Sequence, residues 1–309
     1  MALHPQTQKL VDQFYASRPK PIWEMDIHEY RRIREQNAKL LAGNPVPVWH
    51  VEDKNIPVLS GNIDIRIYTP HNLKSDGVIL YFPGSGFVDG NLASQDNTCR
   101  QIANCSECKV VQVSYRAAPE FIYPIGLNDA FAAIEWIHDH ALALGINRNK
   151  VAIMGYSSGA NFAALCAIRA RNEHRPIRCV VLNAPVTDLA CDFASYEEFS
   201  SGYILESKAL DYFLQVYLPK NTDRKDAHVS PFYEKNLFDL PPTLIQTSEF
   251  DPLADDGKKY AEKLKAAGND VKYTCYKGQI HALLAWSGGV LNEGENPCEE
   301  VGRYIKQYF

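Results

Sequence analysis

The chain has 309 residues, 46% of them hydrophobic, and a formal net charge of −5 at pH 7. This length and composition predict a globular protein with a large core rather than a disordered chain. The negative charge leaves no broad basic field, so nucleic acid is a poor candidate partner.

The chain also lacks the usual signals for membrane insertion, secretion and metal binding. No apolar run approaches the roughly 18 residues of a membrane span, and the first residues do not resemble a secretory signal. We therefore expect a cytoplasmic protein whose eight cysteines are mostly reduced. Cys99, Cys105 and Cys108 lie close together, but neither a fourth zinc ligand nor a redox motif accompanies them. We expect no metal and no cofactor.

The first 43 residues are polar and helical in pattern. Asp26 and Glu29 form a candidate capping box for a helix over 27–41, which Gly43 closes. This segment is expected either to pack on the core or to cover a pocket. Its basic residues are interpreted as a solvated helix face: Arg31, Arg32 and Arg34.

From Pro45 the hydrophobic pattern takes a period of two, which predicts an antiparallel sheet edge with inward residues Val46, Val48, Val51, Ile63, Ile65 and Ile67. Beyond residue 77 the apolar runs become continuous, as in parallel strands covered on both faces. These strands are predicted at 78–82, 110–113, 151–154, 179–182, 244–246 and 271–276. Helical segments alternate with them, at 94–105, 127–144 and after residue 157, and then at 260–268 and 299–308.

This alternation predicts an α/β fold with a mostly parallel central sheet, whose functional groups gather at the carboxyl ends of the strands. The stretch from about 187 to 237 breaks the rhythm and is interpreted as an insertion. The sheet-forming parts are then about 46–186 and 238–309.

Gly155-Tyr-Ser157-Ser-Gly159 follows a buried strand and precedes an alanine-rich helix. G-x-S-x-G in this context predicts a nucleophile elbow, in which the two glycines leave room for the crossing of strand and helix and Ser157 stands on a strained turn. Taken alone, the pattern also fits an ordinary glycine-rich turn, so the other parts that a nucleophilic serine needs decide its meaning.

A serine hydroxyl needs a base, usually a histidine oriented by a carboxylate. Asp251 and His281 both follow the ends of predicted strands downstream of Ser157, in the order serine, acid, histidine. They are therefore the predicted acid and base.

Other residues compete for the roles of acid and base. Asp255 and Asp256 stand near Asp251, but they fall at a helix start, where carboxylates cap the helix and meet its dipole. His174 and His228 are interpreted as surface residues. Gly278 is expected to permit the turn that leads to His281.

A tetrahedral intermediate also needs N–H donors for its oxyanion. The N–H of Ser158, next to the nucleophile, is one predicted donor. The loop Pro83-Gly-Ser85-Gly86 follows an earlier strand, and the N–H groups of Ser85 and Gly86 are the other predicted donors. By itself this loop would be an ordinary turn.

Several segments in order resemble the hormone-sensitive-lipase-like esterases of the α/β-hydrolase fold, from about residue 60 onward. They are P-G-S-G-F (83–87) where the family has H-G-G-G-[FW], S-Y-R-A-A-P-E (114–120), Y-P-I-G-L-N-D-A (123–130), G-Y-S-S-G-A-N (155–161) where it often has G-D-S-A-G-G-N, D-P-L-A-D (251–255) and G-Q-I-H-A-L (278–283). The resemblance implies a Ser157, Asp251 and His281 triad. It also implies a helical cap formed by residues 1–45 and about 187–237.

Three residues depart from the family pattern. Pro83 replaces a histidine, Ser85 a glycine and Tyr156 an acidic residue. Because the triad is intact, we expect a serine carboxylester hydrolase acting through an acyl-enzyme, with short-chain or aryl esters favoured by analogy. The alternative is a hydrolase-fold protein that binds a small ligand with little or no turnover.

The predicted partner is a small-molecule ester, and homodimer formation is left open. Aromatic residues of the cap could line a substrate pocket but are interpreted mainly as cap core: Tyr196, Phe199, Tyr203, Tyr212, Phe213 and Tyr217.

Overall fold

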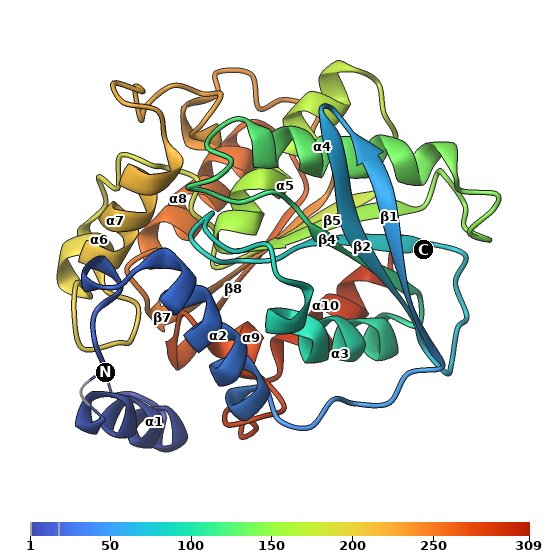
Figure 1. Ribbon diagram of the computed structural model, residues 1–309. Coiled ribbons are helices and arrows are strands. Elements are labelled where there is room, and N and C mark those ends of the chain that lie inside the picture. Colours follow the sequence, from blue (N-terminus) through green and yellow to red (C-terminus); the bar gives the residue numbers. More distant parts are fainter. Residues whose placement is uncertain (1, 18) are drawn as a thin grey trace.

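A computed structural model describes residues 2–17 and 19–309 (Figure 1). In these residues eight strands form one sheet in the order β1-β2-β4-β3-β5-β6-β7-β8. β1 and β2 form an antiparallel hairpin, β2 pairs antiparallel with β4, and all later pairings are parallel. The strands are β1 His50–Val58, β2 Gly61–Thr69, β3 Val78–Phe82, β4 Lys109–Ser114, β5 Val151–Tyr156, β6 Cys179–Asn183, β7 Thr243–Phe250 and β8 Val271–Ile280.

Helices cover both faces of this sheet. Side chains of α4, α5 and α8 share one buried cluster, and those of α3 and α10 share a cluster on the opposite face (Figure 1). The helices are α1 Pro5–Ala16, α2 Ile27–Leu41, α3 Asp96–Ser106, α4 Ile125–Asp139, α5 Ser158–Asn172, α6 Ala194–Glu198, α7 Ser207–Tyr217, α8 Ala254–Ala266, α9 Leu283–Trp286 and α10 Pro297–Ile305, with short 3₁₀ turns at Ile22–Glu24, Leu92–Gln95 and Pro231–Tyr233. The predicted α/β class is confirmed.

Some element boundaries differ from those predicted. The edge strand begins at His50, beyond Val46 and Val48, and α4 ends at Asp139 because residues 140–144 form a turn. β8 does not turn at Gly278 but continues to Ile280. Gly278 has φ +68°, and the β7–β8 register shifts nearby, so this glycine permits an irregularity within the strand rather than ending it.

The segment between β6 and β7 is fixed to the sheet-flanking helices near its start and again at Val229. Near its start, Thr187 donates its N–H to the buried carboxylate of Asp256 in α8 over 2.8 Å. Asn161 in α5 donates through Nδ2 to the carbonyl oxygens of Val186 and Val229, both over 3.0 Å. Helices α6 and α7 of this segment lie on the same side of the molecule as α1 and the first turns of α2 (Figure 1).

Candidate active site

Ser157 stands at the tight connection between β5 and α5. Its backbone has φ 54° and ψ −120°, a conformation that costs strain in a residue with a side chain. A Cβ atom on Gly155 would lie 2.1 Å from the carbonyl oxygen of Gly159, and one on Gly159 would lie 2.0 Å from that of Phe82. Only glycine fits at these two positions, so the G-x-S-x-G spacing follows from backbone packing.

The structure brings Ser157, His281 and Asp251 together. His281 Nε2 lies 3.0 Å from Ser157 Oγ, and His281 Nδ1 lies 2.8 Å from Asp251 Oδ2. Asp251 is fully buried, and its Oδ1 accepts the N–H of Leu253 over 2.9 Å. A carboxylate that accepts this hydrogen bond assigns the proton to Nδ1, which leaves Nε2 facing the serine hydroxyl as an acceptor.

The residues that competed with Asp251 and His281 for the roles of acid and base have other partners or are exposed. Asp255 accepts the N–H of Ser195 over 3.0 Å, and Asp256 binds Thr187. The interpretation of these aspartates as helix caps is therefore incomplete, because both tie the segment between β6 and β7 to α8. Burial raises the pKa of Asp256 to about 7. His228 is exposed, as the sequence predicted.

The N–H groups of the three predicted oxyanion donors differ in whether they already have a hydrogen-bond partner. Ser158 is the first residue of α5, where an N–H has no intrahelical partner. Gly86 N–H has no hydrogen-bond partner within the part of the chain that the structure describes. Ser85 N–H instead donates to the Ser158 hydroxyl oxygen over 3.0 Å, a contact that sequence reasoning missed because it joins residues far apart in the chain.

Hydrogen bonds hold the loop in which Pro83 and Ser85 depart from the family pattern. Ser85 Oγ accepts the N–H of Asp89 over 3.1 Å and lies 3.1 Å from the Tyr115 hydroxyl oxygen. Tyr115 donates to the Pro83 carbonyl oxygen over 2.8 Å, and burial raises the pKa of Tyr115 to about 12. The Ser85 side chain thus makes contacts that a glycine could not.

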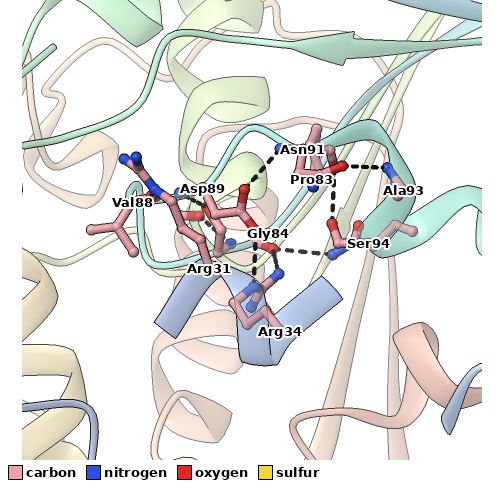
Figure 2. Close-up of polar contacts among 12 residues, drawn as sticks. Arg31, Arg34, Pro83, Gly84, Val88, Asp89, Asn91, Ala93 and Ser94 are labelled. Carbon is pink, nitrogen blue, oxygen red and sulfur yellow. Dashed lines mark hydrogen bonds and ion pairs between the residues drawn. The ribbon is translucent and has the colours of Figure 1, made fainter. Parts of the chain in front are cut away.

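Two arginines of α2 reach this loop, so the interpretation of Arg31 and Arg34 as solvated is wrong. Figure 2 shows both side chains extending from the helix to the loop. Arg34 Nη2 donates to the Gly84 carbonyl oxygen over 2.9 Å, and Arg31 Nε donates to that of Val88 over 2.6 Å. The available sequence signal was their spacing of three residues, which places them on one helix face. Arg32 is exposed.

Tyr156, which replaces an acidic residue of the family pattern, supports the histidine. Its hydroxyl donates to the backbone carbonyl oxygen of His281 over 3.1 Å, and the two ring centroids are 5.2 Å apart. Burial raises the pKa of Tyr156, so this hydroxyl stays neutral near pH 7. The substitution replaces a charge next to Ser157 with a neutral contact to the segment that carries His281.

A cavity of about 10 Å³ adjoins Ser157 and Gly86, close to the least space that holds one water molecule. Phe213 of α7 closes it against the loop: a Cβ atom on Gly86 would lie 2.3 Å from Phe213 Cδ2. Leu210 and Leu214 of the same helix also line the cavity. The space next to the candidate nucleophile is therefore small and apolar.

In residues 2–17 and 19–309, no group of three or more His, Cys, Asp or Glu side chains is arranged to hold a metal ion. No helix of the same residues is long and apolar enough to cross a membrane.

Residues 79–285 match the family model described as alpha/beta hydrolase fold. An arylesterase of Saccharolobus solfataricus is 30% identical, with 100% of each chain covered, and an ethyl acetate hydrolase of Pseudomonas putida is 30% identical over 95% of this chain and 94% of that protein. The structure of a hyperthermophilic esterase from Pyrobaculum calidifontis superposes with a TM-score of 0.94 at 33% identity, covering 99% of both chains.

The chain therefore belongs to the alpha/beta hydrolase fold family, among its hormone-sensitive-lipase-like carboxylesterases. It is an enzyme that hydrolyses carboxylic esters. The alternative of a ligand-binding protein without turnover gains no support from these relatives, which are named as ester hydrolases or esterases.

Proposed function

We propose that this esterase works through a covalent acyl-enzyme, with Ser157 as nucleophile, His281 as general base and acid, and Asp251 as the carboxylate that orients the histidine. The observation that carries the proposal is the continuous hydrogen-bonded line from Ser157 Oγ through His281 to Asp251, with distances of 3.0 and 2.8 Å. Such an arrangement activates a hydroxyl that is otherwise a weak nucleophile at neutral pH.

The reaction has two stages. Ser157 Oγ attacks the ester carbonyl carbon while its proton moves to His281 Nε2. The tetrahedral intermediate collapses, the alcohol leaves with the proton from His281, and the acyl group remains on Ser157. His281 then takes a proton from a water molecule that attacks the acyl-enzyme, and returns it to Ser157 Oγ as the acid leaves.

The N–H groups of Gly86, Ser158 and Ser85 are the proposed oxyanion donors. Gly86 and Ser158 have free N–H groups beside Ser157 among the described residues, and Ser85 N–H must leave the Ser158 hydroxyl to take part. Each such donor is worth roughly 3–4 kcal/mol in the barrier.

The proposed substrates are esters with a short acyl chain, the alcohol part being aliphatic or aryl. The small cavity beside Ser157, closed by Phe213, supports a small acyl group. We also propose that residues 1–45 and about 187–237 form a cap over the site, residues 1 and 18 lying outside the described part. Support comes from α2, which binds the oxyanion loop, and from α7, which lines the cavity.

The test is hydrolysis of p-nitrophenyl acetate by the purified protein. We expect a burst of p-nitrophenol in wild type and none in Ser157→Ala, because the acyl-enzyme cannot form without the hydroxyl. Ser106→Ala is the matched control, since it removes a buried serine hydroxyl of α3 that, among the described residues, bonds only its own helix and Cys108. Equal rates in wild type and Ser157→Ala would refute the proposed mechanism.

A further inference from the structure

The carbonyl oxygen of Gly84 is held by two donors from outside its own loop. Arg34 Nη2 donates to it over 2.9 Å and Gln95 Nε2 over 3.1 Å, which uses both lone pairs of the oxygen. Arg34 also donates through Nε to Asp89 Oδ2 over 3.2 Å (Figure 2). The guanidinium therefore bridges Gly84, in the predicted oxyanion loop (83–86), and Asp89, which lies just beyond that loop.

This carbonyl belongs to the same peptide group as the N–H of Ser85. A trans peptide is planar, and its C=O and N–H bonds point in opposite directions. Donors that fix the Gly84 oxygen therefore also fix the direction of Ser85 N–H, which points toward Ser158 next to the nucleophile. A charged donor on the oxygen also polarises the peptide and strengthens its N–H as a donor.

Asp89 links the same arginine to the Ser85 side chain, because the Asp89 N–H donates to Ser85 Oγ while its carboxylate accepts from Arg34. Asp89 is 5% exposed, so this ion pair is shielded from solvent on the aspartate side. Arg34 thus acts on Ser85 through two routes, the Gly84 peptide and Asp89. Pro83 has no side-chain donor, so it can bind neither the Gly84 carbonyl oxygen nor the Asp89 carboxylate.

We propose that Arg34 is a positioning residue for the oxyanion hole: from α2 it holds the Gly84–Ser85 peptide beside Ser157, so that the Ser85 N–H needs only to leave the Ser158 hydroxyl to reach the tetrahedral intermediate. The inference rests on the proposed function. It assigns to the N-terminal segment a part in transition-state stabilisation, in addition to any part in covering the site.

The test compares Arg34→Gln and Arg34→Lys with Arg32→Gln, a matched control because Arg32 is an exposed arginine on the same helix. The measurements are kcat and KM for p-nitrophenyl acetate and the inhibition constant of a trifluoromethyl ketone, which forms a charged tetrahedral adduct with an active serine. We expect Arg34→Gln to lower kcat by about 10- to 100-fold with KM within about twofold, since small misplacements of a catalytic group cost about this much.

The inhibition constant of the ketone should rise by a similar factor in Arg34→Gln. Both kcat and the inhibition constant of Arg34→Lys should lie between those of wild type and Arg34→Gln, because an ammonium group can still donate to the Gly84 oxygen. Equal kcat in Arg34→Gln and Arg32→Gln overturns the inference, as does a fall in kcat without weaker ketone binding. If Arg34→Gln does not fold, a wild-type kcat in Arg34→Lys overturns it. Activity that survives Ser157→Ala would instead refute the proposed function.

Discussion

Replacing Ser158 with alanine removes the oxygen that accepts the Ser85 N–H in the free enzyme. If Ser85 N–H serves the oxyanion, this hydrogen bond must break on the way to the transition state. A neutral hydrogen bond of this kind contributes about 1 kcal/mol net, which corresponds to roughly a fivefold change in rate. We therefore expect Ser158→Ala to raise kcat/KM for p-nitrophenyl acetate by up to about fivefold.

The same substitution should make the protein less stable. Ser85 is 4% exposed, so its N–H loses a partner in a place that solvent hardly reaches. An unsatisfied buried donor costs about 1–3 kcal/mol. Urea unfolding should therefore show a lower free energy of unfolding, while Ser106→Ala, which removes a hydroxyl from α3, should leave kcat/KM unchanged.

Two results would refute this reasoning. A fall in kcat/KM of about 100-fold would mean that the Ser158 hydroxyl itself donates to the oxyanion, since loss of one such donor has this effect. An unchanged kcat/KM would mean that Ser85 N–H stays on Ser158 throughout the reaction and is no part of the oxyanion hole.

Phe213→Ala should enlarge the cavity beside Gly86. The ratio of kcat/KM for p-nitrophenyl hexanoate to that for p-nitrophenyl acetate should then rise about tenfold. An unchanged ratio would mean that the acyl group binds elsewhere. A second prediction concerns acid stability. Although burial opposes it, hydrogen bonds from Gln246, Lys272, Thr274 and Tyr276 lower the pKa of Glu300 to about 2. The folded-state pKa lies below the unfolded one, so this stabilisation is complete above about pH 4.5 and is lost as the pH falls toward 2. It amounts to about 3 kcal/mol, and Glu300→Gln should show a correspondingly flatter loss of unfolding free energy over this range; an equal slope in both proteins would contradict it.

The positions of Asp251 and His281 could be predicted because they depend on local patterns. Each follows an apolar run that reads as a strand, and the carboxyl ends of parallel strands meet at one edge of the sheet. The strands β7 and β8 run beyond the predicted ends at 246 and 276 to Phe250 and Ile280, directly before these residues. The class of fold follows from the same regularity.

The contacts of Arg34 and Asp256 could not be predicted, because a charged side chain on a helix fits both a solvated face and a buried partner. The sequence shows the spacing of the charges but not which face meets the rest of the chain. The partners of Arg34 lie 50 and 55 residues away. Such pairings depend on how the helices are placed on the sheet, which no local pattern determines.

The anchoring of the segment between β6 and β7 bears on how the enzyme could be re-engineered. Asn161 holds both Val186 and Val229, so the two ends of the intervening chain stay side by side on α5, the helix that follows Ser157. A closed loop of this kind can change in length at little entropic cost, since closure entropy grows only slowly with loop size. We therefore expect grafts within residues 190–228 that keep the contact of Ser195 with Asp255 to reshape the cavity beside Ser157, while Asn161 holds Val186 and Val229 in place.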